Sequence, residues 1–227
     1  MTKAIKPALT ALLLAAAFQA AAVPYPTHDM NRIVQPNHID MAAADAVIGD
    51  LNRHAGDYPV QFDRPAERQR AQQEAAMLIR LFDTLLEQNV ITRKDSDYPA
   101  MLRRLARLNW MAHNMDMPGH AAAADRRYRA LLAVTPATDK PALQSEYGGF
   151  LAATAQTGAA VSMLQKAVKG GYTPAGKLLA LAYLAQGKNT QAKSALRSYV
   201  QKHPADTQAK TLLDAVERGK VQIKQHR

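Results

Sequence analysis

The stretch MAHNMDMPGH combines three Met, two His and one Asp, the densest set of candidate ligands in the sequence. Thioether and imidazole groups together suit a soft ion such as Cu(I). His113, Met117 and His120 are spaced so that they would share one helix face, but Pro118 and Gly119 break the helix between the last two. No second Met/His cluster supports them. We therefore predict a helix end and turn without a bound metal, and copper binding is the alternative.

Sequence patterns of common enzyme sites are absent. The chain contains no HExxH, GxSxG, Walker or GxGxxG motif. Glu67, Glu74 and Glu87 are spread along one long predicted helix with basic neighbours, which favours a solvated face over an acid/base pair. We expect no catalytic activity and no cofactor; an enzyme acting on the cell wall or on polysaccharide is the least favoured alternative.

The first residues have the pattern of a secretory signal peptide. Two lysines precede an apolar run from Ala8 to Phe18, and a series of small residues ends at Ala22. The apolar run is about half as long as the ~20 residues of a membrane span, so no transmembrane segment is expected after cleavage. The chain has no cysteine, which excludes a lipidated cysteine and any disulfide. We predict a signal peptide over 1–22 and a periplasmic protein.

The remaining chain is predicted to be all-α. Apolar residues recur at helical spacing, most clearly over 66–90. One face of that segment carries Ala71, Ala75, Leu78, Phe82, Leu85 and Leu86. We expect an irregular segment at 23–38, a helical N-terminal part at 39–96, helical repeats with a capping helix at 97–219, and a basic tail at 220–227.

Two segments within the repeat region share one residue rhythm. It runs through Ala112, Met115, Gly119, Ala124, Tyr128, Leu131 and Pro136, and again 68 residues later through Ala180, Tyr183, Gly187, Ala192, Leu196, Tyr199 and Pro204. A less regular unit between them contains Ala160, Leu164 and Ala167. The rhythm resembles the tetratricopeptide repeat, whose period is about 34 residues. This resemblance implies an α-solenoid of helix-turn-helix repeats, in which alanines allow close helix contacts, glycines allow turns and prolines end helices.

The resemblance also implies a partner-binding groove along the first helix of each repeat. By the family's pattern, its residues are Asn109, His113, Asp116, Met117 and Lys177. The partner is expected to be a protein or peptide of the cell envelope. The implied function is a non-catalytic scaffold, adaptor or chaperone-like role in envelope or surface-structure assembly; an accessory role in type IV pilus biogenesis is an alternative.

The charge of the chain leaves one further alternative open. Lys and Arg outnumber Asp and Glu by 29 to 19. Three arginine clusters contribute to this excess: Arg64, Arg68 and Arg70; Arg103, Arg104 and Arg107; and Arg126, Arg127 and Arg129. Nucleic acid is not an expected partner, because the protein is predicted to be exported and the arginines lack interleaved aromatics. The basic residues are expected to serve solubility, or to attract an acidic protein segment or the anionic envelope surface.

Overall fold

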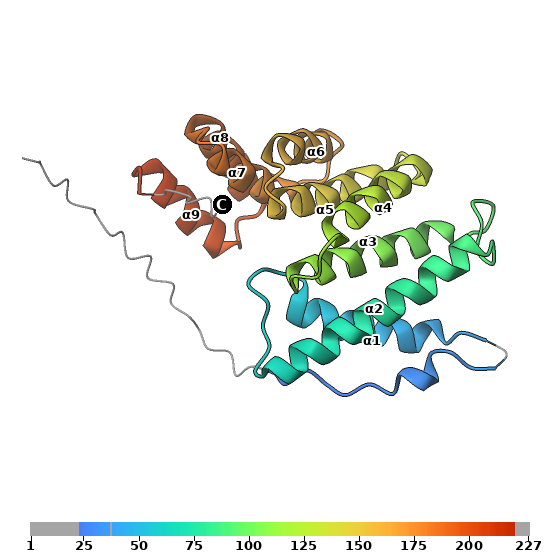
Figure 1. The fold of residues 1–227 in the computed structure, drawn as a ribbon. Helices are drawn as coiled ribbons and strands as arrows, with labels where there is room; N and C mark the ends of the chain where they lie inside the picture. Colours follow the sequence, from blue (N-terminus) through green and yellow to red (C-terminus); the bar gives the residue numbers. More distant parts are fainter. Residues whose placement is uncertain (1–22, 37, 221–227) are drawn as a thin grey trace, which may run out of the picture.

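The computed structural model describes residues 23–36 and 38–220 and is all-helical, which confirms the predicted class (Figure 1). The helices of these residues are η1 (Met30–Arg32), α1 (Met41–Ala55), α2 (Pro65–Glu87), α3 (Tyr98–Asn114), α4 (His120–Val134), α5 (Lys140–Ala153), α6 (Thr157–Lys169), α7 (Ala175–Ala185), α8 (Asn189–Lys202) and α9 (Thr207–Glu217). Within them, the remaining regular pairing is one isolated β-bridge between Val34 and Ile39. The predicted signal peptide at 1–22 lies outside the described residues.

No described helix is both long enough and apolar enough to cross a membrane.

Helices that follow one another in the chain pack against one another. The most extensive contacts join α3 to α4, α5 to α6, and α7 to α8. Further contacts join α2 to α3, α6 to α7, and α8 to α9, so each pair also touches the next element. Figure 1 shows this succession from the blue and green helices to the red α9.

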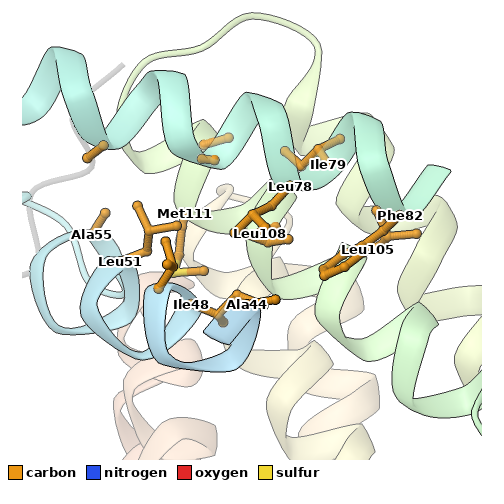
Figure 2. Packing of buried hydrophobic residues seen from close by; sticks show 14 of the residues in the cluster. Ala44, Ile48, Leu51, Ala55, Leu78, Ile79, Phe82, Leu105, Leu108 and Met111 are labelled. Carbon is orange, nitrogen blue, oxygen red and sulfur yellow. The ribbon is translucent and has the colours of Figure 1, made fainter. Parts of the chain in front are cut away.

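Apolar side chains form three successive core clusters. In the first, side chains from α1, α2 and α3 point toward one another, among them Leu51, Leu78 and Leu108 (Figure 2). The second cluster joins α3 to α4, α5, α6 and α7, and the third joins α7 to α8 and α9. Because α3 and α7 each contribute to two clusters, they link neighbouring cores into one structure.

The small residues of the repeat rhythm lie at helix contacts. Pro136 and Pro204 lie just beyond the ends of α4 and α8, and Tyr183 is half-buried between two clusters. The alanines of the rhythm, Ala112, Ala124, Ala180 and Ala192, are all fully buried. Alanine at these positions allows close approach of the paired helices, since a larger side chain would have no space.

The two turn glycines are not equivalent, although the sequence rhythm aligns them. Gly119 and Gly187 both have a left-handed backbone, with φ of 83° and 71°. Gly187 follows the C-cap of α7, whereas Gly119 is the N-cap of α4. The residue that closes α3 is Asp116, with φ of 63°, and Ala155 closes α5 with φ of 59°. The turn after α3 is therefore longer than the turn after α7, although both contain the glycine that the rhythm places there.

Two adjacent glycines in α5 are expected to respond in opposite ways to alanine. A Cβ at Gly148 would lie 2.6 Å from Leu164 Cγ, so Gly148→Ala should lower the free energy of unfolding by about 1–2 kcal/mol. A Cβ at Gly149 would meet Leu178 and Trp110 at 3.7 Å, an ordinary contact. Because alanine favours a helix, Gly149→Ala should raise the free energy of unfolding by about 0.5–1 kcal/mol. Urea denaturation measures both, and changes of the same sign would contradict this packing.

Candidate binding cleft

An open cleft of about 1470 Å³ lies along α3, α5 and α7, with the loop after α1 as one wall. Asn114 fixes that loop, because its Nδ2 donates hydrogen bonds to the carbonyls of Ala55 and Gly56. Four segments line the cleft. The lining residues used below are Asp57 and Tyr58 from the loop, Arg103, Arg107, Trp110 and His113 from α3, Ser145, Glu146 and Gly149 from α5, and Tyr172 and Leu178 before and within α7.

The middle of the cleft is apolar. Tyr58, Tyr172 and Leu178 are 72%, 37% and 36% exposed, and they make up three of the seven exposed large hydrophobic residues in the described chain. Trp110 is half-buried and lies edge-on to Phe150, with ring centroids 5.8 Å apart. Exposed apolar side chains gathered in a hollow are typical of a site that binds another molecule.

One end of the cleft is basic. Arg107 Nε donates a hydrogen bond of 2.9 Å to Glu146 Oε1, and Arg103 Nε lies 3.8 Å from Glu146 Oε2. The hydroxyl of Tyr128 donates to the same carboxylate at 3.2 Å. Burial, and then the charge of Glu146, raise the pKa of Tyr128, so this phenol is a neutral donor. Two guanidinium groups therefore share one carboxylate.

The structure places two of the five predicted groove residues in the cleft, namely His113 and Asp116. Asn109 lies inside the protein instead: it is 2% exposed, and its Nδ2 donates to the carbonyl of Leu105. Met117 packs against the core between α1, α2 and α3. The predicted groove is thus wrong for these two residues, because α3 presents a different face to the cleft.

Lys177 also lies away from the cleft, where it helps to fix α9. Its Nζ donates a hydrogen bond of 3.0 Å to Asp206 Oδ2, and the hydroxyl of Tyr199 donates to the same oxygen. The other oxygen of Asp206 accepts from the backbone N–H of Ala209 and caps the helix. This backbone bond and then Lys177 lower the pKa of Asp206 to about 2. Lys177 therefore has a structural partner and is not a groove residue.

The Met/His stretch does not converge on a metal site. His113 faces the cleft and Met117 faces the core, while His120 Nδ1 lies 2.7 Å from Asn109 Oδ1. In the part of the chain that the structure describes, no group of three or more His, Asp or Glu side chains is placed to hold an ion. The residues that would form the copper site are thus separated by the packing of α3 and its turn.

Acidification is expected to destabilise the protein through His120. Burial lowers the pKa of this imidazole below its ordinary 6.5, so the unfolded chain takes up the proton first. The stability that this histidine contributes is therefore lost as the pH falls below about 6.5. Thermal unfolding between pH 7.5 and pH 5 should show a larger decrease in Tm for the wild type than for His120→Gln. Parallel Tm profiles for the two proteins would rule out this role.

Comparison with known proteins identifies no relative. No protein-family model matches the chain, and no curated protein or solved structure matches it. The assignment of a function therefore depends on the residues of this chain.

A second polar cluster fastens the N-terminal segment to α2. The hydroxyl of Tyr25 donates a 2.5 Å hydrogen bond to Glu74, whose carboxylate also lies 2.8 Å from His28 Nδ1. The opposite ring nitrogen of His28 lies 2.9 Å from Asp50 Oδ2 on α1. Because the two carboxylates bind opposite sides of one imidazole, the cluster connects the N-terminal segment to both α1 and α2.

The predicted solvated face of α2 is therefore wrong for two of its three glutamates. Glu67 and Glu74 are 8% and 5% exposed, whereas Glu87 is exposed as expected. The N-terminal segment covers this face: the backbone N–H of Tyr25 donates to Glu67, and Arg70 donates to the carbonyl of Tyr25. The sequence carries no local signal of these contacts, because the covering segment is irregular and distant in the chain.

Proposed function

We propose that the protein is a non-catalytic adaptor that holds a segment of a protein partner in the cleft. In this proposal the helix pairs α3–α4, α5–α6 and α7–α8 are tetratricopeptide-like repeats of an α-solenoid, and α9 caps the last pair. The pairwise packing and the buried alanines support this arrangement. A solenoid stacks each pair on its neighbours and uses its concave side for binding.

The observation that carries the proposal is the position of the exposed apolar side chains. Tyr58 is far in the sequence from Tyr172 and Leu178, yet the three residues line one hollow beside Trp110. Leaving such groups in water has a cost, since each Å² of apolar surface that a partner covers contributes roughly 25 cal/mol. A partner that covers them therefore gains binding free energy.

The polar groups of the cleft favour binding over catalysis. A general base must lie within hydrogen-bond reach of the group that it activates. Glu146 is already engaged by Arg107 and Tyr128. Among the described residues, no side-chain hydrogen bond joins the imidazole of His113 to the carboxylate of Asp57 or Asp116, although all three line the cleft. The cleft can orient a ligand with these groups, and we infer no reaction step.

Site-specific photo-cross-linking tests the proposed function in cells that produce the full chain. A photoreactive residue at Ala142 or Ala153 would lie in the cleft, whereas one at Ala159 would lie on the exposed surface of α6. We expect a discrete protein adduct from the two cleft positions and none from Ala159. Equal adducts from all three positions, or adducts from Ala159 alone, would refute partner binding in the cleft.

We also propose that the protein works in the periplasm, with a partner from the cell envelope. The signal-peptide pattern of residues 1–22 supports this location. A general attraction to the anionic envelope surface is a secondary possibility that the excess of basic residues favours.

Processing after Ala22 is a separate prediction of this location. The mature protein should begin at Val23, because the small residues that end at Ala22 form the cleavage pattern. Intact-mass spectrometry of the periplasmic fraction measures the N-terminus. A protein that retains Met1 and fractionates with membranes would contradict the prediction.

A further inference from the structure

The cleft is basic at one end and apolar in its middle, and this arrangement points to the kind of segment that it binds. We propose that the partner presents an acidic side chain to Arg103 and Arg107, and an aromatic or large aliphatic side chain to Trp110, Tyr172 and Leu178. This inference rests on the proposed function, since it names the chemistry of the partner in the same cleft.

The two arginines have hydrogen-bonding capacity to spare. Arg103 and Arg107 contact Glu146 through Nε, and their side chains remain 45% and 49% exposed. Within the described residues, their Nη groups make no hydrogen bond. Arg104 is different, because its Nε and Nη2 both donate to Asp45, at 2.7 and 2.6 Å. An incoming carboxylate would find free guanidinium donors in the cleft, and such charge-assisted bonds are among the strongest in proteins.

Several other arginines of the predicted clusters already have partners within the chain. Arg127 donates to Asp83, Arg129 pairs with Asp125, and Arg68 pairs with Asp116. The cationic groups of the cleft thus differ from these neighbours, since two of them share one partly buried carboxylate. The unused Nη donors of Arg103 and Arg107 are what a carboxylate of the partner complements.

The spacing along α3 limits the sequence of such a segment. Arg103, Arg107 and Trp110 follow one another on one helix face. A rise of 1.5 Å per residue places Trp110 roughly 5–10 Å along the helix axis from the two arginines. An extended chain advances about 3.3 Å per residue. The acidic residue should therefore stand two or three positions from the apolar one.

The opposite end of the cleft gives the segment a direction. His113 and Asp116 lie beyond Trp110, at the end of α3 and just after it, whereas the arginines lie on the earlier turns of α3. A carboxylate bound in the reverse direction would lie away from the two arginines and beside Asp116, whose own cationic partner is Arg68. The apolar side chain enters between the two ends, where Gly149 contributes no side chain and leaves the surface of Trp110 and Leu178 open.

Short synthetic peptides test the inference on the wild-type protein. The probe is an acetylated and amidated decapeptide of Ala and Ser that carries one Phe and one Glu two positions apart. Trp110 is the single tryptophan of the chain, so its fluorescence emission reports binding in the cleft without a label. We expect saturable binding of this probe, a Kd raised about tenfold or more when Glu becomes Gln, and a further loss when Glu becomes Lys.

Protein variants provide a second arm of the same experiment. Arg107→Gln and Arg103→Gln should each raise the Kd of the Glu-containing peptide and leave the Kd of the Gln-containing peptide unchanged. The control is Arg126→Gln, which removes an exposed cation of α4 outside the cleft and should change neither Kd.

The possible results separate the inference from the proposed function. Equal Kd values for the Glu and Gln peptides would overturn the acidic requirement and leave apolar docking intact. No response of Trp110 to any peptide would also overturn the inference, while adducts from Ala142 and Ala153 would still support partner binding.

Discussion

Ala192→Arg is expected to lower the free energy of unfolding by about 3 kcal/mol or more. Ala192 is fully buried in the core cluster that α7, α8 and α9 share, beside Ala180, Leu196 and Val216. A long side chain has no space there, and its charge would have no partner in this apolar cluster. Both effects raise the free energy of the folded state.

The matched control is Ser194→Arg, which adds the same side chain to an exposed position of the same helix. It should change the free energy of unfolding by no more than about 0.5 kcal/mol. Urea denaturation of both variants gives the comparison. Equal destabilisation, or the reverse order, would mean that the α7–α8 contact is not packed as described.

Glu74→Ala is expected to cost about 3 kcal/mol of stability. Glu74 accepts a hydrogen bond from the hydroxyl of buried Tyr25 and contacts His28, which also contacts Asp50. Removing the carboxylate leaves these polar groups with fewer partners in a buried place. It also weakens the attachment of the N-terminal segment to α2.

Glu87→Ala is the control for this prediction, because Glu87 lies on the same helix and is exposed. Chemical denaturation should show a small effect for Glu87→Ala and a large one for Glu74→Ala. Limited proteolysis should also cut Glu74→Ala earlier than the wild type, within residues 26–36. If the two variants are equally stable and equally resistant, the polar cluster does not fasten this segment.

The repeat rhythm of the sequence predicts burial better than it predicts the binding surface. Small residues such as Ala124 and Ala192 recur because two helices must approach closely, and this requirement is local to each pair. The turn after α3 breaks the regularity, since Asp116 rather than Gly119 closes that helix. Asn109 lies in the interior, where its side chain bonds to the carbonyl of Leu105 and to His120 at the start of α4.

The cleft and the fastening cluster depend on contacts between distant segments, which sequence spacing does not encode. Glu74 meets residues of an irregular segment far upstream, and Lys177 pairs with Asp206 beyond α8. One signal for the cleft was present in the sequence. Arg103, Arg107 and Trp110 stand at positions i, i+4 and i+7, a stripe that places both arginines and the single tryptophan on one helix face.

The measurement that tests partner binding in the cleft most directly is cross-linking from Ala153 in a Gly149→Leu protein. Gly149 borders the cleft, and a Cβ there would lie 3.7 Å from Leu178 and from Trp110, so a leucine at this position extends into the apolar part of the cleft. The matched control is Gly158→Leu in α6, where an added Cβ would meet no atom within 4 Å. We predict that Gly149→Leu loses the partner adduct at an unchanged or higher Tm, and that Gly158→Leu keeps it. A full adduct from the Gly149→Leu protein would show that the partner does not occupy this cleft.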